Sequence, residues 1–229
     1  MMKFISGTRI PLNEEQFIDA ATAQFYNEHA RRFMGQVYRR FAAQVAGIGL
    51  PGNRVLDIGT GNGRLAIDLA KDHTDWQITG VDISEEMLKL ARQNAARDGL
   101  AERIDFRQAS AQMLPFADGY FALTISNASL HLWADPLKVF KEIARVTAPG
   151  GYCFIWDNLR ITLLNPLLRL VGWAMGMNAA QRRLWMRAIR SSYTLGETKA
   201  ILNESALKDA RVIFTAGLLG LGIAWRKTL

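Results

Sequence analysis

The chain has 229 residues, a formal charge of +7 and 49% apolar residues. This length suffices for one domain with a large core, and the composition is that of a globular protein rather than a disordered one. The single cysteine, Cys153, excludes internal disulfides, and its apolar neighbours indicate a buried, inert thiol. No apolar run reaches the roughly 20 residues of a membrane span, and the first residues lack the apolar core of a secretion signal. We therefore expect a cytoplasmic protein.

The first part of the chain is helical in pattern. Apolar residues recur at helical spacing through residues 13–46, and the glycines and proline of residues 47–52 end that pattern. We therefore predict an N-terminal helical cap over residues 1–50.

Strand and helix patterns alternate after the cap. Strands are predicted at 53–58, 76–82, 103–107, 119–126 and 151–157. Helices are predicted at 62–72, 84–98 and 135–147. Such alternation favours a parallel sheet that helices cover on both faces.

The glycine turn after the first strand is the most informative feature. An apolar strand runs into Gly59, Gly61 and Gly63, and the next strand ends at Asp82. Glycines permit a tight turn and let a ligand approach the backbone, whereas a carboxylate at a strand tip can accept ribose hydroxyls. The pair of segments predicts a pocket for an adenosine-containing cofactor at the carboxyl edge of the sheet.

The glycine spacing selects the cofactor. The dinucleotide pattern G-x-G-x-x-G requires a third glycine at position 64, which is Arg64. The chain instead has G-x-G-x-G, preceded by Asp57, and this resembles the first motif of class I S-adenosylmethionine-dependent methyltransferases. S-Adenosylmethionine carries no phosphate, and its cationic amino group and sulfonium suit an acidic neighbour such as Asp57.

Downstream segments extend the resemblance. Residues 114–121 read LPFADGYF, residues 129–133 read SLHLW, and residues 142–151 read EIARVTAPGG. All three are similar to landmarks of the methyltransferase-11 family, which includes the ubiquinone and menaquinone C-methyltransferases. The similarity extends from about residue 26 to 157. It implies a Rossmann-like α/β fold with a seven-stranded, mostly parallel sheet and an antiparallel last strand.

The resemblance also implies a set of cofactor contacts, with S-adenosylmethionine as the cofactor. They are Tyr26, Asp57, Gly59, Thr60, Gly61, Gly63, Asp82, Ile83, Ser110, Ala111 and Asn127.

Individual roles follow the family pattern, and each has a structural alternative. Asp82 would bind the ribose or cap the helix near Ser84, and Ile83 would contact the adenine or belong to the core. Asn127 would face the methyl group or end a strand, and Tyr26 would close over the cofactor. His131 is a candidate general base, or else a hydrogen-bonded structural histidine. Three scattered histidines and one cysteine predict no metal site.

Two positions depart from the family pattern. Ser110 stands where the family usually has an aspartate facing the adenine amino group, and Ala122 replaces an aspartate after the LPF segment. A serine hydroxyl can still form a hydrogen bond. These departures keep open an alternative, a non-catalytic protein that binds S-adenosylmethionine or S-adenosylhomocysteine. A nicotinamide-dependent oxidoreductase is disfavoured by Arg64.

The basic charge is concentrated in one apolar stretch. Residues 160–192 contain six arginines and no Asp, Glu or Lys, together with many Leu, Met and Trp residues. We predict a helical cover over 158–195 that encloses the acceptor. The alternatives are two amphipathic helices with solvated arginines, or a peripheral contact of 160–192 with a membrane. Pro166 and Gly172 interrupt the run, so we expect no single spanning helix.

The last part, 196–229, predicts a helix and a β-hairpin. Two strand-like runs, 210–215 and 218–227, are separated by Ala216-Gly217, which favours antiparallel pairing. We expect one methyltransferase domain over 1–229, with its cofactor-binding core at 51–157. It would methylate a small-molecule acceptor that is lipophilic or anionic. No nucleic-acid partner is expected, because no reading module is present. The oligomeric state stays open.

Overall fold

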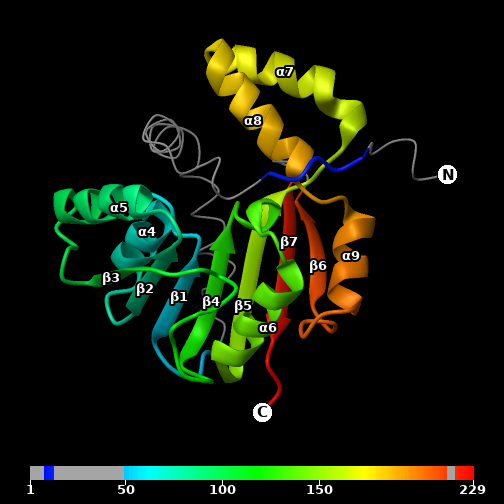
Figure 1. Cartoon of the computed structure of the whole chain (residues 1–229). Helices are drawn as coiled ribbons and strands as arrows, with labels where there is room; N and C mark the ends of the chain where they lie inside the picture. The colour runs from blue at the N-terminus through cyan, green and yellow to red at the C-terminus, as the bar shows by residue number, and fades with distance from the viewer. Residues whose placement is uncertain (1–7, 13–48, 216–219) are drawn as a thin grey trace.

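The computed structural model describes residues 8–12, 49–215 and 220–229 (Figure 1). Within these residues seven strands form one sheet, in the order β3-β2-β1-β4-β5-β7-β6. The strands are β1 (Arg54–Ile58), β2 (Gln77–Asp82), β3 (Ile104–Gln108), β4 (Phe121–Asn127), β5 (Thr147–Asn158), β6 (Arg211–Thr215) and β7 (Gly220–Arg226).

The pairing of the strands confirms the predicted fold class. Strands β1 to β5 pair in parallel, whereas β7 runs antiparallel to both β5 and β6. The last strand in the chain is therefore the reversed one, and the predicted hairpin exists as the β6–β7 pair. Ile58 lies opposite Val81 in the β1–β2 register, so the turn after β1 comes beside Asp82.

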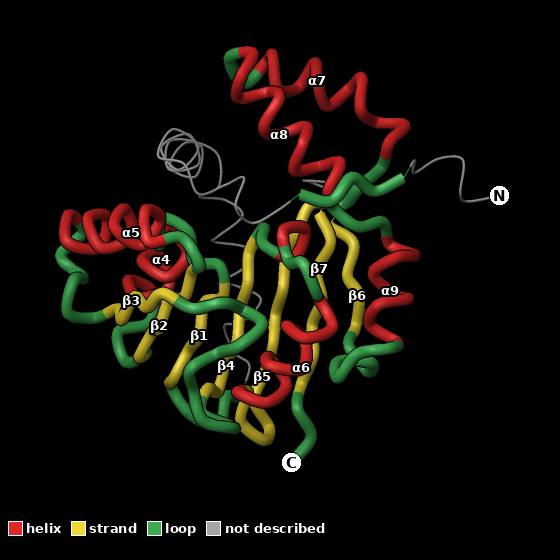
Figure 2. The backbone as a smooth tube through the Cα atoms, in the orientation of Figure 1, coloured by secondary structure: helices red, strands yellow, loops and turns green. Residues whose placement is uncertain are grey.

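Helices lie between the strands along the chain (Figure 2). They are α4 (Arg64–Asp72), α5 (Glu85–Arg97), α6 (Pro136–Val146), α7 (Asn165–Ala174), α8 (Ala179–Ser191), α9 (Leu195–Asn203) and the short 3-10 turns η3 (Leu130–Leu132) and η4 (Thr162–Leu164). Helix α4 begins two residues later than predicted, because Gly63 at its N-cap has a φ of 75°. Helix α5 begins after Ser84, whose hydroxyl accepts a hydrogen bond from the Met87 amide.

Alternating residues of each strand supply two cores. On one face Val55 and Phe154 lie in the core that α4 and α5 cover. On the other face Leu56 and Cys153 join the core that includes Phe140 of α6. Two buried faces explain why the strands are apolar almost throughout. Burial also raises the pKa of the Cys153 thiol, as an inert thiol requires.

Helices α7 and α8 form a hairpin that projects beyond the carboxyl edge of the sheet (Figure 1). Gly172 does not interrupt α7, in contrast to the prediction. It is buried inside the helix, where a Cβ would lie 3.1 Å from the Trp185 ring, so its role is close packing on α8. The chain turns instead at Gly176, with a φ of 72°. No helix in the described residues is long and apolar enough to cross a membrane. Most of the predicted cap, 1–50, lies outside the described residues.

Candidate functional site

A cleft opens at the carboxyl edge of the sheet, where the ends of β1 and β2 meet the start of α5 and the turn η3. Its lining consists of Ile58, Gly59, Val81, Asp82, Ile83, Ser84, Met87, Ala109, Ala111, Ser129, Leu132 and Trp133. Four of the predicted cofactor residues are among them, namely Gly59, Asp82, Ile83 and Ala111.

The three glycines of the turn serve different purposes, although all have a positive φ. At Gly59 a Cβ would lie 2.1 Å from the Ser129 hydroxyl oxygen, so packing requires glycine there. At Gly63 a Cβ would come within 3 Å of Phe106 and Ala91, so this glycine lets α4 approach its neighbours. At Gly61 a Cβ would meet nothing within 4 Å among the residues that the structure describes. The backbone at Gly61 is therefore open to a ligand.

Asp82 is held at the tip of β2 by two backbone amides. The Gly61 amide donates to Oδ2 at 2.8 Å, and the Ser84 amide donates to Oδ1 at 2.9 Å. Burial raises the pKa of this carboxyl, whereas the amide bonds lower it. Each carboxylate oxygen keeps a second lone pair, so Asp82 can accept further hydrogen bonds from ribose hydroxyls.

Asp57 lies beneath the turn and is almost completely buried. Its Oδ2 accepts a hydrogen bond of 2.7 Å from the Thr60 hydroxyl. Burial raises the pKa of Asp57 to about 7, with a smaller contribution from the charge of Asp82. A carboxyl with this pKa changes its charge near neutral pH, so a nearby cation would favour its ionised form.

The other predicted contacts lie around the cleft. Ile83 is exposed and apolar at its rim, as an adenine contact would be. The side chain of Ser110 is engaged in its own turn, where its hydroxyl accepts from the Gln112 amide, and it is not part of the lining. Tyr26 lies outside the described residues.

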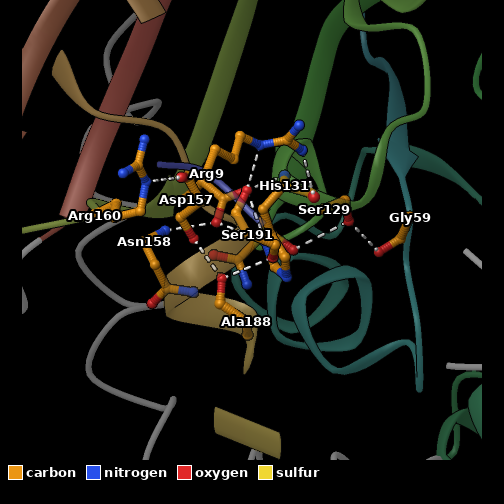
Figure 3. Close-up of polar contacts among 11 residues, drawn as sticks. Arg9, Gly59, Ser129, His131, Asp157, Asn158, Arg160, Ala188 and Ser191 are labelled. Carbon is orange, nitrogen blue, oxygen red and sulfur yellow. Dashed lines mark hydrogen bonds and ion pairs between the residues drawn. The ribbon is translucent and has the colours of Figure 1, made fainter. Parts of the chain in front are cut away.

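A buried histidine–aspartate pair lies beside the cleft (Figure 3). The Nδ1 atom of His131 is 2.8 Å from Oδ1 of Asp157, and the His131 amide donates to Oδ2 of the same carboxylate at 2.8 Å. The Asn158 amide donates to Oδ1 at 2.6 Å. His131 Nε2 is buried and has no hydrogen-bond partner among the described residues. The same holds for the side-chain oxygen of Asn127 at the end of β4.

Polar contacts hold the segment 129–131, which carries the histidine, on two sides. On one side Arg9 donates to the carbonyl oxygens of His131 and Ser191, the last residue of α8. On the other side the Ser129 hydroxyl donates to the carbonyl of Gly59 in the glycine turn (Figure 3). The segment that carries the histidine thus lies between the glycine turn and the base of the α7–α8 hairpin.

The residues present fit S-adenosylmethionine. The open backbone at Gly61 stands beside a carboxylate with free lone pairs, and an exposed apolar side chain, Ile83, follows it. Ala109 and Ala111 leave room on the facing wall of the cleft. Among the described ranges no cluster of three or more metal-ligating side chains occurs.

Comparison with known proteins agrees with this geometry. Residues 56–155 match the model of a family described as a methyltransferase domain. These residues form a methyltransferase domain. The match covers the glycine turn, Asp82 and residues 127–131. It confirms the family resemblance of the sequence.

Two curated relatives illustrate the match. The chain is 37% identical over 110 residues to 27-O-demethylrifamycin SV methyltransferase of Amycolatopsis mediterranei. This alignment covers 48% of the chain and 40% of the relative. The chain is 41% identical over 106 residues to the ubiquinone/menaquinone biosynthesis C-methyltransferase UbiE of Bdellovibrio bacteriovorus, covering 46% and 44%. The chain thus spans less than half the length of either relative.

The fold of the methyltransferase domain also has solved counterparts. The plantazolicin methyltransferase BpumL, solved with a triazolic desmethylPZN analogue and SAH, superposes with a TM-score of 0.73 at 15% identity, over 94% of both chains. At this identity the likeness concerns the fold.

Several residues in and beside the cleft were not predicted from the sequence. Asp157 is the partner of His131, and the signal for it was an acidic residue at the end of an otherwise apolar strand, β5. Met87 and Trp133 also line the cleft. In the sequence they cannot be distinguished from apolar residues that belong to the ordinary core. Their role depends on where α5 and η3 lie relative to the turn.

Proposed function

We propose that this chain is an S-adenosylmethionine-dependent methyltransferase that acts on a proton-bearing group of a small-molecule acceptor. The observation that carries the proposal is the cleft at Asp82, whose carboxylate accepts from the Gly61 amide, within a domain that matches the methyltransferase family. The two named relatives, an O-demethylrifamycin methyltransferase and a C-methyltransferase, differ in the acceptor atom that their names imply. The acceptor class is therefore argued from His131.

Four residues would hold the cofactor. Asp82 would accept the ribose hydroxyls, Ile83 would lie against the adenine, and the backbone of Gly59 and Gly61 would follow the remainder of the molecule. When bound, S-adenosylmethionine supplies a methyl group on a cationic sulfur, which makes the methyl electrophilic. The protein then mainly has to align an acceptor with that methyl group and exclude water.

His131 is suited to take a proton from the acceptor. Because Asp157 accepts at Nδ1, the proton of a neutral imidazole resides on Nδ1 and Nε2 keeps its lone pair. Nε2 is buried and has no hydrogen-bond partner among the described residues, so none of these residues engages that lone pair. The carboxylate of Asp157 would stabilise the imidazolium that forms. Such a base favours acceptors that lose a proton on methylation, such as hydroxyl groups.

The experiment compares two variants of the pair with wild type. His131→Gln and Asp157→Asn should reduce the rate of S-adenosylhomocysteine formation from a hydroxylated acceptor by roughly 10²- to 10⁴-fold, the usual contribution of a general base. Binding of S-adenosylmethionine, measured by calorimetry, should stay within about twofold of wild type, because neither side chain is placed on the cofactor. A panel of small molecules, each incubated with S-adenosylmethionine labelled in its methyl group, would identify the acceptor as the molecule that takes up the label.

His73→Gln is the matched control, since His73 stacks on Trp76 away from the cleft. It should leave the rate unchanged. If His131→Gln retains full turnover while its fold is intact, the histidine is structural and the preference for proton-bearing acceptors is withdrawn.

A second candidate function is non-catalytic binding of the cofactor. The observation that favours it is Ser110, whose hydroxyl is engaged in its own turn and does not line the cleft. Calorimetry would then give S-adenosylmethionine binding, whereas no acceptor in the panel would yield S-adenosylhomocysteine.

A further inference from the structure

Exposed apolar side chains gather on one helix of this protein. Twelve large apolar side chains are exposed among the described residues, and five of them lie within eleven residues, in η4 and α7. They are Leu163, Leu167, Leu170, Val171 and Trp173. Soluble proteins rarely leave such a patch without a partner, so its concentration on one element indicates a binding surface.

Four of the five side chains share the outer face of α7, and Leu163 precedes them in η4. Leu168 and Gly172 are buried towards α8, where Gly172 packs on Trp185. At 3.6 residues per turn the opposite side of the helix carries Leu167, Leu170 and Ala174, and Trp173 and Val171 flank this row. Trp173 is 68% exposed and Leu170 is 59% exposed. Helix α7 thus buries one apolar stripe and presents a second one outward.

The same hairpin is strongly cationic. Residues 165–191 hold five arginines and no acidic residue, whereas Arg160, which precedes the hairpin, is buried and paired with Glu197. Arg169 is exposed on α7, at the margin of the outer face, and Arg183, Arg187 and Arg190 form an exposed row on α8 at positions i, i+4 and i+7. An apolar face combined with arginines and without acids complements a surface that is both greasy and negatively charged.

We propose that the outer face of α7 docks this protein on an anionic lipid surface. A lipid surface is favoured over a protein partner because α7 presents an apolar face with Arg169 at its margin. The rest of the hairpin adds exposed arginines on α8 and contains no acid that could pair with a partner's cations. The hairpin projects beyond the sheet, so α7 can reach a flat surface without obstruction by the sheet (Figure 2). The helix would lie in the interface, since it is too short to span a membrane.

Docking would also orient the cleft. The hairpin stands at the carboxyl edge of the sheet, the edge at which the cofactor cleft lies (Figure 1). The lipid surface and the cleft would therefore be on the same side of the molecule. This inference is independent of the proposed methyl transfer, because it concerns residues that do not line the cleft.

The test uses the full chain and two kinds of vesicle, phosphatidylcholine with or without phosphatidylglycerol. We expect sedimentation with the anionic vesicles, weak sedimentation with the neutral ones, and loss of binding as salt rises, because salt screens the arginine attraction. The emission of Trp173 should shift to shorter wavelength in the anionic vesicles, and this shift should be missing in Trp173→Phe.

Two double variants separate the apolar contribution from the charge contribution. Leu167→Asn with Leu170→Asn should weaken vesicle binding at least about tenfold, because each leucine loses its burial in lipid. Arg169→Gln with Arg183→Gln should weaken binding about fivefold per arginine, and only to anionic vesicles. Both pairs are exposed, so the fold should be retained.

Matched controls lie elsewhere on the surface. Leu137→Asn on α6 removes an exposed leucine, and Lys199→Gln with Lys208→Gln removes two exposed cations. Neither control should change vesicle binding by more than about twofold.

Three results would overturn the proposal. One is the absence of binding to anionic vesicles at low salt. Another is binding that Leu167→Asn with Leu170→Asn leaves unchanged, since the α7 face would then not be the contact. The third is a dimer in sedimentation velocity that this same double variant dissociates while vesicles are not bound, which would assign the face to a second copy of the chain.

Discussion

At the scale of single residues, Asp82 has the most direct part in the proposed cofactor site. Asp82→Ala removes the acceptor for ribose hydroxyls, and charge-assisted hydrogen bonds contribute roughly 1.5–3 kcal/mol each. We expect S-adenosylhomocysteine to bind at least about tenfold more weakly in calorimetry. The amides of Gly61 and Ser84 also lose their acceptor, so the free energy of unfolding should be measured on the same variant.

The control for this prediction is Asp105→Ala on β3, because Asp105 is exposed and paired with Arg107. It should bind the ligand like wild type. Equal affinity of wild type and Asp82→Ala would remove Asp82 from the site.

Asp57 gives the protein a pH dependence whose sign can be worked out. Its pKa is about 7 in the folded protein and 3.8 ordinarily, because burial disfavours the charged form. The folded state therefore holds this proton more tightly than the unfolded state, and its stability falls as pH rises from about 4 through about 7. Asp57→Asn can keep the bond from Thr60 without ionising. It should thus gain stability over wild type at pH 8, by a few kcal/mol at most, and little near pH 4.

The affinity for S-adenosylmethionine should rise with pH, whereas stability falls with pH, if Asp57 lies near the cationic end of the cofactor. Between about pH 5.5 and 7.5, below the usual pKa of an α-amino group, wild type should bind S-adenosylmethionine more tightly as Asp57 ionises. Urea unfolding and calorimetry across this range check both slopes. If the affinity of Asp57→Asn for S-adenosylmethionine still rises with pH, another group is responsible for the pH dependence.

At the scale of elements, the glycine turn makes two different predictions for similar substitutions. Gly59→Ala should destabilise the fold strongly, because the new Cβ would lie 2.1 Å from the Ser129 oxygen in addition to the strain of a positive φ. Gly61→Ala meets no neighbour in the described part of the chain and should lose only about 1–3 kcal/mol through its φ of 54°, while it obstructs the ligand. Thermal unfolding and calorimetry separate the two effects.

A second substitution makes the comparison decisive. Ser129→Gly removes both atoms that the new Cβ of Gly59→Ala would meet, so it should restore part of the lost stability. It should have no such effect on Gly61→Ala. Equal losses of stability at Gly59 and Gly61, without rescue, would mean that φ strain alone requires these glycines.

At the scale of the whole molecule, the sheet order brings distant parts of the chain to one edge. Strands β1, β2 and β4 end side by side in the parallel sheet, so Asp57, Asp82 and Asn127 lie near one another. The α7–α8 hairpin follows β5 and stands at this same edge, and Arg9, far away in sequence, bonds to Ser191 at its base. The cofactor cleft, the histidine pair and the proposed lipid-binding face therefore occupy one side of the protein.

The sequence by itself determined the alternating sheet, its reversed last strand and the glycine turn. These depend on local signals, namely apolar periodicity, the positions of the glycines and the acidic residue that ends β2. The turn favours glycine because its φ values are positive, and the glycines can be recognised in the amino-acid sequence alone.

Only the tertiary structure decided which side chains meet. His131 and Asp157 are 26 residues apart and pair because β4 and β5 are neighbours in the sheet. Gly172 resembles a helix breaker in sequence, yet it lies within α7, and its missing side chain lets Trp185 of α8 pack closely, since a Cβ would lie 3.1 Å from that ring. The outward apolar face of α7 likewise depends on which stripe α8 covers. Local sequence patterns specify elements, whereas contacts between elements depend on packing across the whole fold, which no single segment encodes.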